Sequence, residues 1–189
     1  MNNLRHHIYF YFYLGFLLCV SPLSHSNDIT PLDSCPTEAF LIQGNEAKLY
    51  GVDLATGGYN ELSTTDGLGT DGVINGIGFN YHDNFIYGWS KVLKTVIKIG
   101  KEYQASALTI TDNPVNDLQE GKGFYIGDIA VNENAYYIYY PNQNSGLYKI
   151  PLDPQDNDYL KALPIADHSQ MGMTVFDFAF HPTLSLIHI

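Results

Sequence analysis

The hydrophobic pattern of the chain recurs with a period of about fifty residues. The stretch 74–89 pairs two apolar runs across a polar turn, and the same arrangement returns at 126–139. Its opening recurs at 175–182, so the starts lie 52 and 49 residues apart (126 − 74 and 175 − 126). Short apolar runs separated by Asn, Asp, His or Pro predict β-strands joined by turns. Several strands in each period are typical of a propeller or a solenoid.

We expect four strands in each complete unit of this repeat. The expected strands are 39–44, 48–54 and 59–63, then 74–80, 85–90, 95–99 and 107–110, then 126–132, 136–140, 147–150 and 162–165, and finally 174–181. The strand at 162–165 contains Pro164, which has no N–H to donate, so we expect it at an outer edge of its sheet. No stretch has a 3.6-residue apolar stripe, so helix should be scarce.

Large and small residues alternate in the first strand of each unit. Gly78, Ala130 and Ala179 each lie between two large apolar residues. Such strands suit sheets that are buried on both faces and crowd together near a common axis. We therefore predict an all-β fold, a partial β-propeller of four-stranded antiparallel blades with the first strands innermost.

The units give an incomplete propeller over residues 39–183. Residues 39–63 supply three strands of a closing blade, 74–110 and 124–165 are blades, and 174–183 holds the first strand of the next blade. Because propellers typically have about four to eight blades, we expect the chain to be truncated at its C-terminus. Residues 184–189 match the translated end of a common sequencing adapter, so we interpret them as an artefact.

The N-terminus has the pattern of a secretory signal peptide. Arg5 precedes 13 apolar residues (8–20), and small residues follow at Ser24 and Ser26, so we expect cleavage after residue 26. A transmembrane helix needs about 20 apolar residues, so no transmembrane segment is expected after cleavage. The chain is therefore predicted to be exported to the extracellular space, the cell surface or the periplasm, with 27–38 as a polar lead-in.

Charge and cysteine content disfavour several kinds of partner. The chain has a net charge of −11, and without residues 1–26 it has 8 Lys against 20 Asp and Glu, which gives 8 − 20 = −12. An acidic surface repels phosphate backbones, so nucleic acid is not expected as a partner. Cys35 is the only cysteine left after cleavage, which suggests either a buried thiol or a partner absent from this sequence.

Asp128 and Asp177 are the main candidate site residues. Each stands just before the innermost strand of its unit, where the first complete unit has Gly76. Inner strands converge at the mouth of a propeller channel, so the two carboxylates are expected close together, where they would hold a cation such as Ca²⁺ or share a proton. The alternative is that each accepts backbone N–H bonds in its own turn.

Asp66 and Asp71 are weaker calcium candidates in a glycine-rich loop. Residues 67–72 have the spacing of a dinucleotide-binding motif, but a strand follows where that motif requires a helix. We therefore interpret the loop as a flexible connection between blades. No cofactor other than Ca²⁺ is expected.

The aromatic residues and histidines fit structural roles. The tyrosines of 136–140 and Trp89 are expected to fill the space between blades, with stacking on sugars as the alternative. His82 and His181 lie in or beside turns. The sequence has no Ser-His-Asp order, nucleophile elbow or P-loop.

Three segments resemble those of an uncharacterised family of exported bacterial propeller-like domains. They are 35–44, which begins Cys35-Pro36, together with 49–57 and 74–80. The resemblance covers residues 35–183. It implies an N-terminal module of a surface or secreted protein, and it brings no catalytic residues with it.

We therefore predict a non-catalytic binding, scaffolding or adhesion-type module of an exported bacterial protein. Its partner would be an unknown extracellular ligand or downstream domains of the same protein. The alternative is an extracellular polysaccharide hydrolase or lyase with Asp128 and Asp177 at the channel mouth.

Overall fold

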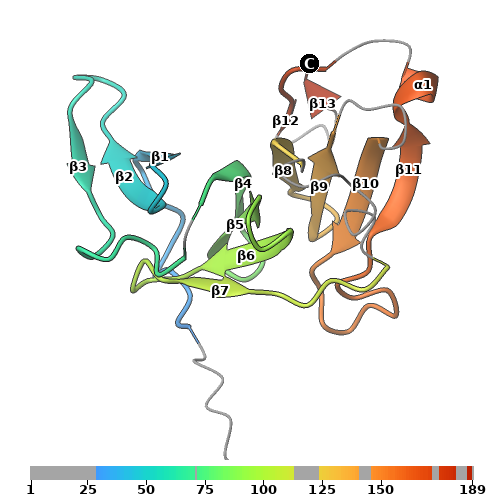
Figure 1. Ribbon diagram of the computed structural model, residues 1–189, viewed down its shortest axis with the longest axis horizontal. Helices are drawn as coiled ribbons and strands as arrows, with labels where there is room; N and C mark the ends of the chain where they lie inside the picture. The colour runs from blue at the N-terminus through green and yellow to red at the C-terminus, as the bar shows by residue number, and fades with distance from the viewer. Residues whose placement is uncertain are drawn as a thin grey trace, which may run out of the picture.

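The computed structural model describes residues 29–70, 72–112, 124–140, 146–171, 175–181 and 187–188. These residues form three antiparallel sheets, one further strand pair and a four-residue helix, α1 (His168–Met171) (Figure 1). The predicted scarcity of helix is therefore confirmed for the described residues, none of which lie in a helix long and apolar enough to cross a membrane.

Each sheet follows the chain order of its strands. Sheet 1 consists of β1 (Ala39–Gln43), β2 (Lys48–Val52) and β3 (Tyr59–Glu61). Sheet 2 consists of β4 (Ile74–Asn80), β5 (Phe85–Ser90), β6 (Thr95–Ile99) and β7 (Ala105–Ala107). Sheet 3 consists of β8 (Ile126–Ala130), β9 (Ala135–Tyr139), β10 (Gly146–Pro151) and β11 (Leu163–Asp167), and β12 (Ala179–Phe180) pairs with β13 (Ile187–His188).

The first strands of successive units lie next to one another. Strand β4 contacts β8, and β8 contacts β12. Figure 1 shows the opposite edges of the three sheets, β3, β7 and β11, at the outside of the molecule. Pro164 lies in β11, the edge strand of sheet 3, as predicted. No sheet of the described residues closes on itself.

Several predicted strand ends are wrong. The last strand of the first complete unit is Ala105–Ala107, not 107–110, and β8 ends at Ala130, not at residue 132. The lone first strand is described only as Ala179–Phe180. Residues 187–188, which the sequence suggested setting aside, pair with it.

The β4–β5 hairpin corresponds to the β8–β9 hairpin with a shift of 50 residues along the chain (134 − 84). The sequence pattern had suggested a shift of 52 residues. Asn84 and Asn134 end equivalent turns, with left-handed φ angles of 59° and 43°, a conformation that Asn tolerates better than most residues. In sheet 2 Gly78 pairs with Tyr87, and in sheet 3 Asp128 pairs with Tyr137. The counterpart of Asp128 is therefore Gly78, and the expected match with Gly76 is wrong.

Sheet 1 matches the last three strands of sheet 3. Leu41 of β1 lies opposite Tyr50 of β2, and Ile138 of β9 lies opposite Tyr148 of β10, with the two tyrosines at matching points of the repeat. Strands β1, β2 and β3 are thus the counterparts of β9, β10 and β11. Sheet 1 has no counterpart of the first strand among the described residues.

The core lies between the sheets. One buried cluster joins sheets 1 and 2, another joins sheets 2 and 3, and a third packs sheet 3 against 175–180. Strands β5 and β9 are buried along their whole length, so sheets 2 and 3 are covered on both faces as predicted. Trp89, Tyr136 and Tyr139 fill these interfaces, which confirms the predicted packing role.

Sheet 1 departs from the prediction because the described residues cover only one of its faces. Its strand β2 alternates half-buried and buried residues, and Leu41 and Tyr59 on the uncovered face are 40% and 74% exposed. We call this surface the open face; cross-strand pairing places on it Leu41, Gln43, Lys48, Tyr50, Val52, Tyr59 and Glu61.

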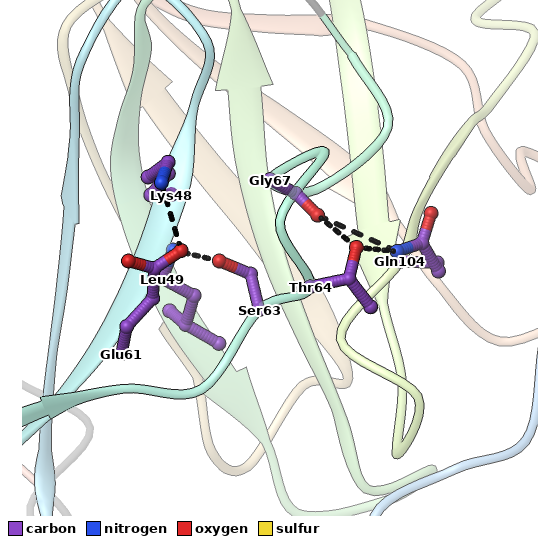
Figure 2. Close-up of polar contacts among 7 residues, drawn as sticks. All are labelled: Lys48, Leu49, Glu61, Ser63, Thr64, Gly67 and Gln104. Carbon is purple, nitrogen blue, oxygen red and sulfur yellow. Dashed lines mark hydrogen bonds and ion pairs between the residues drawn. The ribbon is translucent and has the colours of Figure 1, made fainter.

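The glycine-rich loop between sheets 1 and 2 is anchored, contrary to the flexible connection expected. Leu68 is fully buried, its N–H donates to the Ala47 carbonyl over 2.8 Å, and its carbonyl accepts from the Ala105 N–H over 2.8 Å. Figure 2 shows Gln104 Nε2 donating to the Gly67 carbonyl at 3.4 Å. The loop therefore fastens sheet 1 to sheet 2.

Candidate functional site

Two hollows of the surface hold polar groups. The first, of about 250 Å³, lies between β1 and the first strands β4 and β8. Its lining consists of Phe40, Ile77, Gly78, Phe79, Ile86 and Asp128. It contains one of the two main predicted site residues, Asp128, so we examine that carboxylate first.

The Asp128 carboxylate links two first strands. Its Oδ1 accepts the N–H of Ile129 over 2.8 Å, and its Oδ2 accepts the N–H of Phe180 in β12 over 2.8 Å. Asp177 repeats the local half of this arrangement, because its Oδ1 accepts the N–H of Phe178 over 2.9 Å. Both aspartates thus accept backbone N–H bonds, although Asp128 lies within β8 and not in a turn.

Burial raises the pKa of Asp128 above its ordinary value, and the charge of Asp177 adds to the rise, while the two N–H bonds oppose it. The charge of Asp177 therefore acts on the Asp128 carboxyl. Within the described part of the chain, no three His, Cys, Asp or Glu residues gather as a metal site would require. Calcium binding by Asp128 and Asp177 stays a prediction.

The first strands approach so closely that a small residue is required. A Cβ added at Gly78 would lie 2.7 Å from Asp128 Oδ1 and 2.8 Å from the backbone nitrogen of Ile129. Nearby, the buried Tyr136 hydroxyl donates to the Gly76 carbonyl over 2.6 Å. The alternation of large and small residues in the sequence thus marks this contact between β4 and β8.

Of the two weaker calcium candidates, one falls within the described residues. Asp66 is exposed in the anchored loop, and Asp71 lies outside the described residues. Cys35 is exposed, so the interpretation as a buried thiol is wrong. His82 lies in the turn after β4, as predicted, with its Nε2 2.6 Å from the Val131 carbonyl.

Each complete unit also carries an acid–tyrosine pair that the sequence analysis missed. Tyr87 donates its hydroxyl to Asp83, and Tyr137 donates its hydroxyl to Glu133 over 2.8 Å. Burial raises the pKa of Asp83, and Glu133 also accepts from Lys149 at 2.6 Å. An acid four residues before a tyrosine at each turn was the signal available in the sequence. The two tyrosines lie on packed sheet faces, so we assign these acid–tyrosine pairs a structural role.

The second hollow is a groove of about 450 Å³ at the β1–β2 hairpin, continuous with the open face. Its lining consists of Gln43, Gly44, Asn45, Glu46, Lys48 and Tyr50. Lys48 is held by Glu61 at 3.0 Å (Figure 2), and the Tyr50 ring meets the exposed Tyr59 ring edge-on, with centroids 5.9 Å apart. Aromatic rings, amides and a balanced ion pair can together bind a polar, uncharged ligand.

The fold and these sites define an all-β repeat protein made of stacked antiparallel sheets, with strands of successive units in contact. A family model described as a repeat of unknown function (DUF6923) matches residues 40–184, so the chain belongs to that family. No curated protein matches the chain.

Proposed function

We propose that the chain is part of a β-propeller and serves as a non-catalytic binding or scaffolding module of an exported bacterial protein. The contacts among β4, β8 and β12, with β3, β7 and β11 on the outside, support a propeller arrangement. The signal-peptide pattern of residues 1–26 supports export.

One observation carries the binding function. The groove at the β1–β2 hairpin gathers Gln43, Asn45 and Tyr50 beside the ion pair of Lys48 and Glu61. The half-buried Tyr50, the exposed Tyr59 and the amide side chains suit polysaccharide, because a sugar presents apolar C–H faces to rings and hydroxyl groups to amides. The acidic chain disfavours polyanionic ligands.

The test measures binding of the labelled protein to isolated bacterial cell walls and to neutral polysaccharides. Tyr50→Ala and Tyr59→Ala should each weaken binding about tenfold or more, because they remove rings of the open face. Tyr125→Ala is the matched control: it too is an exposed tyrosine in edge contact with another tyrosine, Tyr140, at 5.8 Å. Absence of binding, or equal loss in all three variants, would contradict the proposal.

A second candidate is an extracellular polysaccharide hydrolase or lyase. The raised pKa of the half-buried Asp128 beside Asp177 favours it, because such pairs serve acid–base chemistry. Release of new sugar ends by the wild type, abolished in Asp128→Asn, would support this candidate over the binding module. A thermal melt with added Ca²⁺ tests the metal hypothesis, because bound Ca²⁺ should raise the Tm of the wild type more than that of Asp128→Asn.

A further inference from the structure

We propose that the turn between β5 and β6 is a docking surface for an acidic segment of another protein, one that also carries apolar side chains. The turn consists of residues 91–94, Lys-Val-Leu-Lys, and we call it the basic–apolar turn. This surface goes beyond the proposed function, because it shares no residue with the groove at the β1–β2 hairpin.

The basic–apolar turn exposes two consecutive aliphatic side chains. Val92 is 59% exposed and Leu93 is 47% exposed. The partly exposed Val73 lies beside them, because its carbonyl accepts the Lys91 N–H over 3.0 Å. Val92 also reaches the backbone next to Val73, since a Cβ added at Gly72 would clash with it. A single exposed apolar side chain is ordinary, whereas neighbouring ones on one surface mark interaction sites.

This apolar surface is held in one conformation. The Leu93 N–H donates to Ser90 Oγ over 3.1 Å, and Ser90 is itself buried at the end of β5. Lys94 closes the turn with a left-handed φ of 51°. A turn that is already ordered loses little conformational entropy when a partner binds, which favours binding.

The repeat shows that the turn itself does not require aliphatic residues. The connection at the matching place in sheet 1, residues 44–47, reads Gly-Asn-Glu-Ala. In the third unit, residues 142–145 before β10 read Asn-Gln-Asn-Ser. Polar residues and glycine are the usual choice in turns because they close the chain locally. Turn formation therefore does not explain Val92 and Leu93.

The charge around the basic–apolar turn indicates an acidic partner. The chain has 9 Lys and Arg against 20 Asp and Glu, yet residues 84–101 contain four lysines and no acidic residue. Within the part of the chain that the structure describes, Lys91 forms no ion pair. A segment with carboxylates beside an apolar side chain would complement both the lysines and the aliphatic residues.

The acidity of the rest of the chain favours a protein segment over an anionic membrane. An extended anionic surface would meet the acidic remainder of the molecule and be repelled by it. A short segment would contact the basic–apolar turn alone. We therefore commit to a peptide segment as the occupant of this surface.

The experiment selects short random peptides, displayed on phage, on the immobilised full chain. The enriched peptides should be acidic and contain an aliphatic or aromatic residue. The double variant Val92→Ser/Leu93→Ser and the variant Lys91→Glu should each bind them at least about tenfold more weakly. The matched control is Leu54→Ser, which changes an 81% exposed leucine in the turn after β2 and should bind like the wild type. Added salt should weaken binding, because it screens surface charges.

Enriched peptides without acidic residues, or equal binding by the wild type and the double variant, would overturn the inference. Vesicles of anionic phospholipid that bind the wild type but not the double variant, with no peptide enriched, would assign the turn to a membrane instead. Self-association lost in the double variant, again with no peptide enriched, would assign the turn to a second copy of the chain.

The same variants separate this inference from the proposed function. The double variant should keep the cell-wall binding of the wild type, because the groove is unchanged. Peptide binding without cell-wall binding would leave this inference standing alone. Cell-wall binding with no peptide enriched would leave the proposed function standing and overturn this inference.

Discussion

Sheets 1 and 3 share matching strands but differ in what covers them. Leu41 and Ile138 occupy the same place, yet Leu41 is 40% exposed and Ile138 is fully buried. Among the described residues, sheet 3 lies between sheet 2 and residues 175–180, whereas sheet 1 packs on one side, against sheet 2 together with Leu32 and Leu68. The strand pattern alone therefore does not decide whether a face is buried, because a neighbouring sheet must be present to cover it.

Truncation of the matching residues Ile138 and Leu41 should give the largest difference in the free energy of unfolding between sheets 3 and 1. Ile138→Ala leaves a cavity between sheets 2 and 3 and should lower the free energy of unfolding by about 2–5 kcal/mol. Leu41→Ala removes a partly exposed side chain and should cost less than about 1 kcal/mol. Chemical denaturation of dilute protein measures both, and equal losses would break the comparison.

Replacing glycine by alanine should give the next largest difference in stability, between a glycine in close backbone contact and one in an open turn. Gly78→Ala forces β4 away from β8 and should cost about 1–3 kcal/mol, as overpacking of an interior does. Gly58→Ala, in the turn before β3, meets only the Thr56 hydroxyl oxygen at 3.3 Å and should be close to neutral. A neutral Gly78→Ala would mean that the first strands are not in tight contact.

Two aspartates should respond to pH in opposite directions. Burial raises the pKa of Asp128, so the folded state holds this proton more tightly than the unfolded chain. The advantage of the wild type over Asp128→Asn should therefore fall as pH rises from about 4, the unfolded pKa, through the raised folded value. In the turn between β2 and β3, the hydrogen bond from Thr56 lowers the pKa of Asp53. The advantage over Asp53→Asn should be complete above about pH 4 and be lost below it. Unfolding measured from pH 3 to 7 tests both slopes, and slopes of equal sign would contradict the assignment.

Removal of one ion pair from sheet 3 and one from sheet 1 should give the smallest difference in stability. Lys149 bonds to Glu133, which also accepts the Tyr137 hydroxyl on a covered face, so Lys149→Met should cost somewhat less than about 1 kcal/mol. Lys48 pairs with Glu61 on the open face, and Lys48→Met should give no measurable change in stability. A larger loss for Lys48→Met would show that the open face is covered in solution.

The sequence predicts those parts of the fold that local pattern decides. The strands at 74–80, 85–90 and 95–99 have the predicted ends, because apolar runs and turn residues bound them. Pro164 marks an edge strand because it lacks a donor. The small residue Gly78 marks the close contact between first strands.

Other features depend on contacts between distant residues. The sequence offset of 52 residues aligns Asn80 with Asn132, but Asn80 ends a strand and Asn132 lies inside a turn. That offset therefore misplaced the counterpart of Asp128 by two residues (78 − 76). The local sequence around Leu68 indicates only a loop, and the burial of its side chain depends on the packing of sheets 1 and 2. The groove at the open face joins residues that alternate along two strands, and it becomes visible only when one face of the sheet is known to be uncovered.

Hydrogen exchange of the native protein at low concentration tests the central claim most directly. Amides of β5 and β9 should exchange only through large-scale unfolding, because both strands are buried between sheets. Amides of β1 should exchange at least about a hundredfold faster, because one edge of that strand pairs with none of the described residues. Protection of β1 equal to that of β5 and β9 in the dilute monomer would contradict the account.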